Sequence, residues 1–325
     1  MVRQADTEAE EEPVPKPSRA ALNGPAHEET LWAGSARAVV ASLRPRQWVK
    51  NLLVFVAPAA AGRFDNGATV GRAFAAFAIF VAVASGMYLM NDVLDAEADR
   101  LHPEKCERPV AAGLITIRQA LSVGALLVIA GLISSWFTAG WRFTVVMALY
   151  VLISAAYSIW VKYVAVVELA SVASGFVLRA IAGGVATHVP LSDWFLAVTS
   201  FAAMFIVIGK RYSEYRSLGE IRDHHRLVLS EYTPSFLQSA LTMTATASVT
   251  AYCLWAFDRT GLAHPSHAIL WTQLTVIPFA IAVLHVLRVL DAGGGAAPEE
   301  LALKDRWLHV FGAVWLAFFL IGIYA

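Results

Sequence analysis

The chain has 325 residues, of which 58% are hydrophobic and 15% are charged. A typical soluble domain is about half apolar and about a quarter charged, so this composition argues against an ordinary soluble enzyme and against a disordered or collagen-like chain. The 25 basic and 25 acidic residues give a net charge of zero, which excludes a global basic field of the kind that binds nucleic acid. The two cysteines are too few for a disulfide framework or a zinc site. The composition therefore predicts a polytopic membrane protein.

The first part of the chain differs from the rest. Residues 1–35 are acidic, contain prolines and lack an apolar run. Such a segment buries too little surface to offset the entropy of ordering, and it has neither the basic start nor the apolar core of a signal peptide. We therefore expect a disordered N-terminal tail at 1–35, followed by one intramembrane domain at 36–325.

Nine apolar segments are candidates for transmembrane helices, because a bilayer core takes about 20 apolar residues per helix. They centre on 47–62, 72–94, 119–138, 142–160, 165–186, 194–209, 237–256, 268–289 and 307–324. The first and the sixth are shorter than that length. Strand-like alternation is absent, so the pattern predicts an all-α membrane protein and not a barrel.

The lysines and arginines give the orientation of these helices. With nine spans and an N-terminus on the inner side, the inner segments carry about 16 basic residues and the outer loops about 4. This bias places the long polar loops near 91–118 and 210–236 on the cytoplasmic side and the C-terminus on the outer side.

An acidic motif closes the second predicted span. On one continuous helix, Asp92, Asp95 and Asp99 would fall within about 60° of one another. Three carboxylates on one face repel one another unless a cation lies among them, and oxygen ligands at this spacing suit Mg²⁺, which also bridges to substrate phosphates. The alternative is a solvated acidic helix end. Lys105 and Arg108 follow in the same loop, where basic groups would share the phosphates of a metal-bound diphosphate.

These motifs resemble a known family. Asn-Asp-x-x-Asp-x-x-x-Asp at 91–99, followed by Arg-Pro-x-x-x-Gly at 108–113, is similar to the UbiA superfamily of intramembrane prenyltransferases, and the resemblance covers about residues 40–325. It implies a transferase domain of about nine transmembrane helices around a central cavity that is open to lipid, with cytosolic cap loops. It also implies that Mg²⁺ binds a diphosphate, which leaves as pyrophosphate.

The chain departs from the family pattern after the sixth predicted span. Most members carry a second Asp-rich motif there, whereas this chain has Lys210, Arg211 and Glu214. With Arg-Pro-Arg-Gln-Trp-Val-Lys-Asn at 44–51, this resembles the branch that transfers phosphoribose from 5-phosphoribosyl 1-diphosphate to decaprenyl phosphate, a polyprenyl phosphate lipid. Fixed cations suit these substrates, because both are polyanions. The branch acts in the plasma membrane, with its site facing the cytoplasm, and its product feeds arabinan precursors of the cell wall.

The resemblance and the charge pattern together assign roles to residues. We expect Asp92, Asp95 and Asp99 to hold Mg²⁺, and Asp92, Asp95 and Lys210 to be catalytic. The expected substrate-binding residues are Arg44, Lys50, Asn91, Lys105, Arg108, Tyr157, Lys162, Arg211 and Glu214. A lipid phosphate is already anionic, so its attack on the ribose needs no strong general base.

Two charges lie inside the fifth predicted span, where charges are costly and often functional. Glu168 and Arg179 differ by about 20° around the helix and should point into the bundle. Contact of Glu168 with substrate or metal, and structural pairing with another helix, both remain open. The Gly183-Gly184 pair is expected to allow close helix packing.

Two other functions fit parts of the pattern. A conventional prenyltransferase, moving a prenyl group from its diphosphate to an aromatic or glycerol-phosphate acceptor, shares the fold and the first motif. A transporter would explain the intramembrane charges, but we find no inverted repeat and the charges crowd one side of the membrane. Small-residue helix faces would permit a homo-oligomer, for which a trimer is a guess.

Overall fold

The computed structural model describes residues 37–103, 105–217, 227–258, 266–292, 301 and 304–324. The predicted tail at 1–35 lies outside these ranges. Within them the chain is helical and contains no strand, which confirms the predicted all-α class.

The α-helices differ widely in length. In chain order they are α2 (Val56–Ala60), α3 (Gly67–Leu94), α4 (Ala96–Arg100), α5 (Ile117–Ile159), α6 (Val167–Thr187), α7 (Asp193–Ser217), α9 (Pro234–Phe257), α10 (Ser266–Leu274), α11 (Val276–Asp291) and α13 (Arg306–Tyr324). Among the described residues, seven helical segments are long and apolar enough to cross a membrane. The predicted count of nine is not confirmed, and two features account for the difference.

The first feature is a reversal inside α5. Ala139 and Gly140 leave helical geometry, and Gly140 has a φ of +75° that suits glycine. The hydroxyls of Ser135 and Thr144 are hydrogen-bonded at 3.0 Å, whereas nine residues of continuous helix would separate them by about 13 Å. The two predicted spans at 119–138 and 142–160 are therefore the two arms of α5.

The second feature is the first predicted span, 47–62, which is not an α-helix of membrane length. It consists of a 3₁₀ helix, η1 (Pro45–Phe55), followed by the five-residue α2. The sixth predicted span was too short for another reason. Its helix, α7, extends to Ser217 and includes the polar residues that follow 194–209.

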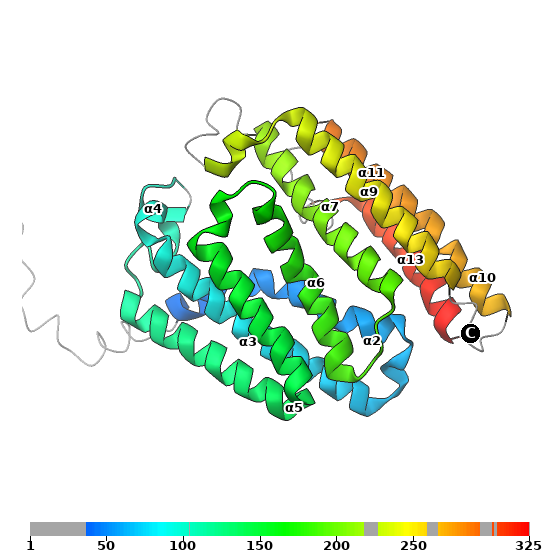
Figure 1. The fold of residues 1–325 in the computed structure, drawn as a ribbon, viewed down its shortest axis with the longest axis horizontal. Coiled ribbons are helices and arrows are strands. Elements are labelled where there is room, and N and C mark those ends of the chain that lie inside the picture. The colour runs from blue at the N-terminus through cyan, green and yellow to red at the C-terminus, as the bar shows by residue number, and fades with distance from the viewer. Residues whose placement is uncertain are drawn as a thin grey trace, which may run out of the picture.

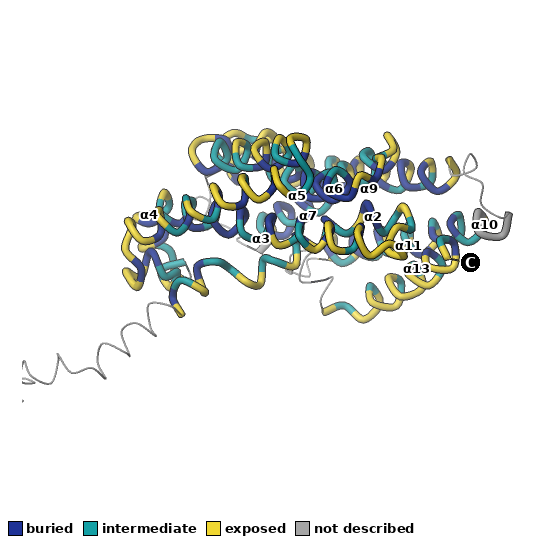
Figure 2. The backbone as a smooth tube through the Cα atoms, turned by 90° about the horizontal axis from the view of Figure 1, so that it is seen from below, coloured by how far each residue is buried: buried dark blue, intermediate teal, exposed yellow. Residues whose placement is uncertain are grey.

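The helices form two groups. Figure 1 shows α3, α5 and α6 on one side and α7, α9, α11 and α13 on the other, and the two groups meet where α6 packs on α7. Buried and exposed residues alternate along the helices, and α13 is largely exposed (Figure 2). The segment that follows α3 contacts the turn before α6 through Asp95 and Lys162, and that turn contacts the segment before α9 through Val166 and Tyr232. These segments therefore meet at one end of the bundle, which we call the charged end.

The segment η1 packs closely on α3 and α6. Val54 is fully buried in a cluster with Phe80 of α3 and Leu178 of α6. A β-carbon added at Gly183 of α6 would lie 1.8 Å from the Val54 carbonyl oxygen, so only glycine permits this approach. The expected role of Gly183 in close packing is thus confirmed.

Gly183→Ala is therefore expected to destabilise the protein. The added methyl group meets backbone and not a movable side chain, so η1 must shift away from α6, at a cost of about 1–3 kcal/mol. Gly312→Ala in α13 is the matched control, because outside its own turn of helix no atom of the described residues lies within 4 Å of the added β-carbon. Thermal unfolding in detergent measures both variants. Equal melting temperatures for the two would contradict the packing described here.

Candidate functional site

The acidic motif is not one continuous helix. Helix α3 ends at Leu94 and α4 begins at Ala96, with Asp95 between them at a ψ of 0°. This ψ differs from the value of about −42° in an α-helix, so the chain bends at Asp95. The three aspartates therefore do not lie on one straight helix, although the backbone hydrogen bonds from Asp95 to the Asn91 carbonyl and from Asp99 to the Asp95 carbonyl continue across the bend. The Asp95 carboxylate caps neither helix, because it is bound by Asn91 and Lys162 instead.

Asp92 and Asp99 converge on one arginine. Arg108 donates through Nη1 to Oδ2 of Asp99 at 2.6 Å and to Oδ1 of Asp92 at 3.3 Å. Arg44, which precedes η1, donates to the same Asp92 oxygen. Both carboxylates are buried, with 2% and 4% of Asp92 and Asp99 exposed, whereas the arginines reach them from partly exposed positions.

Asp95 faces a different cation. Nζ of Lys162, in the short 3₁₀ helix η4 (Val161–Tyr163), donates to Oδ1 of Asp95 at 2.5 Å, and Nδ2 of Asn91 donates to Oδ2 at 2.9 Å. Burial alone would lower the pKa of Lys162, but the hydrogen bond and negative charge of Asp95 outweigh this and raise it. Lys162 is therefore a cation throughout the physiological pH range.

These contacts define what the acidic motif can bind. Among the described residues, no three carboxylate, histidine or cysteine side chains are gathered closely enough to hold a metal ion. The three-aspartate magnesium site therefore stays a prediction. A smaller donor set does fit the ion, since Mg²⁺ is usually held by one or two carboxylates together with substrate phosphates. Asp92 and Asp95 supply two such carboxylates.

A second cluster of charges lies between α6 and α7. Arg211 donates through Nε and Nη2 to the two oxygens of Glu168, both at 2.7 Å, and through Nη1 to Oε2 of Glu214 at 2.8 Å. Glu168 is fully buried and Arg211 is 4% exposed. Arg211, which we expected to bind substrate, is thus held by two carboxylates. Glu168 is thus paired with Arg211 on another helix, which is one of the two alternatives that the sequence left open.

Tyr232 was missed in the sequence and completes this cluster. Its hydroxyl lies 3.4 Å from Oε1 of Glu168 and accepts a hydrogen bond of 2.8 Å from the backbone N–H of Val166. Val166 has a φ of +66° and forms a tight turn closed by a hydrogen bond from Val167 to Ala165, which is strained for a β-branched residue. Burial, followed by the charge of Glu168, raises the pKa of Tyr232 to about 12, so the hydroxyl keeps its proton.

The other expected binding residues lie in elements that reach the charged end. Lys105 is in the short 3₁₀ helix η3 (Lys105–Glu107), Tyr157 is in the last turn of α5, Lys210 is beside Arg211 in α7, and Lys50 is in η1. The ammonium of Lys50 lies 5.8 Å from the centre of the Phe176 ring, so this lysine points toward α6.

Arg179 does not share partners with Glu168. Its guanidinium donates to Oδ1 of Asn51 at 2.7 Å, to the Gly175 carbonyl at 2.6 Å and to the Tyr150 hydroxyl at 3.2 Å. It also lies over the Phe80 ring at 4.9 Å. No carboxylate pairs with Arg179 in the described part of the chain. Its contacts instead fix η1 against α5 and α6.

We expect Arg179→Met and Asn51→Leu each to lower the free energy of unfolding by about 1–3 kcal/mol, because each leaves a buried polar partner unsatisfied. The double variant should lose less than the sum of the two, as for any directly coupled pair. Arg142→Met removes an exposed arginine that lies beside the Trp141 ring and has no ion pair among the described residues, so it should change little. Chemical unfolding of the four variants tests this; strictly additive effects would contradict the coupling.

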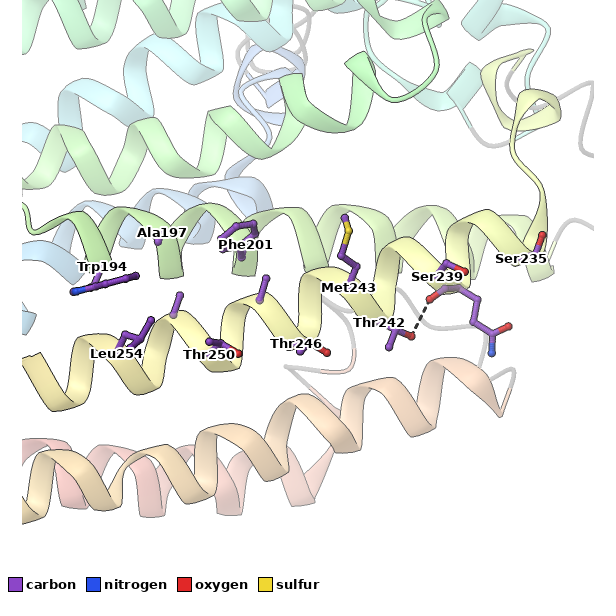
Figure 3. A pocket seen from close by; sticks show the side chains of 13 residues that line it. Trp194, Ala197, Phe201, Ser235, Ser239, Thr242, Met243, Thr246, Thr250 and Leu254 are labelled. Carbon is purple, nitrogen blue, oxygen red and sulfur yellow. Dashed lines mark hydrogen bonds between the residues drawn. The ribbon is translucent and has the colours of Figure 1, made fainter.

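A separate groove of about 900 Å³ lies between α7 and α9. Figure 3 shows its lining, which combines apolar side chains such as Trp194, Phe201 and Met243 with hydroxyls such as Thr242. The Thr242 hydroxyl donates to the Gln238 carbonyl of its own helix at 2.9 Å. None of the expected site residues lines this groove, so the charged end and the groove are different features.

Comparison with known proteins agrees with this arrangement. Residues 52–311 match the UbiA prenyltransferase family. The decaprenyl-phosphate phosphoribosyltransferase of Mycolicibacterium smegmatis is 41% identical over 286 residues, which cover 86% of this chain and 90% of that protein. The protein of the same name from Corynebacterium glutamicum is 39% identical over 292 residues, covering 89% and 87%.

Solved structures show the same fold at lower identity. A UbiA homologue from Archaeoglobus fulgidus, solved with DMAPP and Mg²⁺ bound, superposes with a TM-score of 0.66 at 17% identity and covers 87% of this chain and 97% of its own. A digeranylgeranylglyceryl phosphate synthase superposes with a TM-score of 0.64 at 15% identity, covering 90% and 99%. The chain is thus a multi-pass membrane protein and belongs to the UbiA prenyltransferase family.

Proposed function

We propose that this protein transfers a 5-phosphoribosyl group from 5-phosphoribosyl 1-diphosphate to decaprenyl phosphate, with release of pyrophosphate. The relatives at about 40% identity carry this activity in their names, and the shared length makes the comparison one of whole proteins. The observation that carries the proposal is the meeting of Arg44, Arg108 and Lys162 with the acidic motif at one end of the bundle. Two polyanionic substrates need such a concentration of cations.

The residues of the charged end have two roles in this proposal, metal binding and phosphate binding. Asp92 and Asp95 would hold Mg²⁺, which supplies positive charge to the departing diphosphate. Arg44, Arg108, Lys162 and Lys210 bind the remaining phosphate oxygens and stabilise the charge that develops on them. The bond between ribose C1 and the diphosphate oxygen breaks with its electron pair going to the diphosphate. An oxygen of the lipid phosphate forms the new bond to C1 from the opposite face.

The setting of the reaction follows from the same proposal. The charged end faces the cytoplasm, where the soluble donor is present, and the protein lies in the plasma membrane. The lipid acceptor enters from the bilayer, so its phosphate reaches the charged end at the membrane surface. The product supplies arabinan precursors of the cell wall.

A product assay tests this function. Purified protein in detergent is given Mg²⁺, phosphoribosyl diphosphate labelled in the ribose, and decaprenyl phosphate. We expect labelled lipid and pyrophosphate in equal amounts. A parallel reaction with a polyprenyl diphosphate and an aromatic acceptor tests conventional prenyl transfer. Product in this second reaction alone would overturn the proposal, as would the absence of product from both in well-folded protein.

A further inference from the structure

Three carboxylates and three cations form one set at the charged end. Asp92 binds Arg44 and Arg108, Asp99 binds Arg108, and Asp95 binds Lys162. The cations come from three separate places in the chain, before η1, after η3 and within η4. We call these six side chains the counterion set. Its charges balance, since three negative groups face three positive groups.

The charge balance of the counterion set affects how a metal ion and a diphosphate can bind to it. We propose that Arg44, Arg108 and Lys162 compete with the metal ion for the carboxylates, so that metal and diphosphate bind well only together. This rests on the proposed function, because it concerns the diphosphate of that donor. When a metal takes Asp92 and Asp95, the ion pairs open, and phosphate oxygens become the new partners of the released cations.

Burial makes this exchange costly for either ligand alone. Asp92 and Asp99 are almost fully buried, and the three cations are between 18% and 28% exposed. A lone divalent cation would leave the set with two surplus positive charges, and a lone diphosphate would leave it with surplus negative charge. Partly desolvated charges without partners are strongly unfavourable. Arrival of both ligands brings the set closer to neutrality than either ligand does alone, because their opposite charges offset each other.

The proposal predicts opposite effects of one substitution on the two ligands. Arg108→Gln removes the cation that contacts both Asp92 and Asp99, so those carboxylates should bind a metal ion more tightly. We expect about tenfold tighter binding of Mn²⁺ alone, given the size of charge interactions at these distances in a protein. Pyrophosphate alone should bind about tenfold more weakly, because one of its cationic partners is gone.

Two further variants serve as replicate and control. Lys162→Gln removes the partner of Asp95 and should shift both affinities in the same directions. Arg118→Gln is matched to them, because Arg118 is an exposed cation near the start of α5 without an ion pair in the described residues. It should leave the affinity for Mn²⁺ unchanged.

Direct binding measurements on full-length protein in nanodiscs test the proposal. Free Mn²⁺ is quantified by electron paramagnetic resonance without diphosphate, and pyrophosphate binding is measured by calorimetry in the presence of EDTA. Melting temperatures identify variants that fail to fold, and Lys162→Gln decides if Arg108→Gln does not fold. Opposite shifts of the two affinities support the exchange. An unchanged or weaker affinity for Mn²⁺ in the folded variants would overturn it.

The result is separable from the proposed function. Opposite shifts in a protein that makes no phosphoribosylated lipid would uphold the exchange and overturn the function. Normal phosphoribosyl transfer by the unmodified protein, together with an affinity for Mn²⁺ that is unchanged in the variants, would uphold the function and overturn the exchange.

Discussion

Asp92→Asn is expected to reduce the turnover of phosphoribosyl transfer by about a hundred- to a thousandfold, the range found when a group that stabilises transition-state charge is removed. The amide keeps the size of the side chain but not its charge. It therefore weakens the hold on a metal ion and leaves Arg44 and Arg108 without the carboxylate that positions both. Pyrophosphate release by purified protein measures the loss.

The matched control is Glu97→Gln in the same motif. Glu97 is exposed on α4, whereas Asp92 is buried, so removal of the Glu97 charge should leave turnover near that of the unmodified protein. Melting temperatures of both variants separate loss of chemistry from loss of structure. Turnover by a folded Asp92→Asn variant within a few fold of the unmodified protein would remove Asp92 from the catalytic site.

Glu168→Gln is expected to give the largest loss of stability. The change removes the charge that Arg211, only 4% exposed, meets with two hydrogen bonds, and it leaves the partly exposed Glu214 as the remaining carboxylate partner of Arg211. Breaking a buried pair by neutralising one partner costs about 3–5 kcal/mol. The Glu168→Met and Arg211→Met double variant should be more stable than either single variant, because no buried charge is then left alone. Unfolding in denaturant measures all of them.

Glu214→Gln is the control for this cluster. Glu214 also binds Arg211, but its side chain is 33% exposed, so its loss should cost less than about 1 kcal/mol. Equal effects of Glu168→Gln and Glu214→Gln would show that burial does not set the strength of these pairs. A double variant no more stable than the single variants would contradict the pairing.

Hydropathy and charge predicted the helical class, most of the spans and the meeting of acidic and basic groups at one end. They did not predict which charges pair. Arg44 lies 48 residues from Asp92 and Lys162 lies 67 residues from Asp95, so these contacts depend on tertiary packing. From the sequence alone, any of the nearby cations could pair with any of the three aspartates. The pairing is decided by where η1 begins and where η4 lies in the folded protein.

The same limit applies to Glu168 and Tyr232. Helical spacing shows that Glu168 faces the bundle, but not whether it meets a substrate or another side chain. Its partner Arg211 lies 43 residues away on α7. Tyr232 gave no signal at all, because a tyrosine just before a helix start is usually read as an interfacial anchor. Its role depends on the strained turn at Val166, which has no sequence signature.

The first segment, η1, is a 3₁₀ helix, and this makes it longer than an α-helix of the same number of residues. A 3₁₀ helix rises about 2.0 Å per residue and an α-helix about 1.5 Å. The contacts show this difference directly. Asn51 meets Arg179 and Val54 meets Gly183, so three residues of η1 advance as far as four residues of α6.

At this rise, the 16 residues of η1 and α2 extend about 29 Å, close to the thickness of a bilayer core, whereas the same residues in an α-helix would extend about 24 Å. Because each residue of a 3₁₀ helix contributes a longer rise, the length of η1 strongly affects the position of the residue that precedes it. Insertion or deletion of one residue in η1 would move Arg44 by about 2 Å along the bundle and rotate it by about 120°, away from Asp92. The length of η1 therefore sets the position of a charge at the mouth of the site.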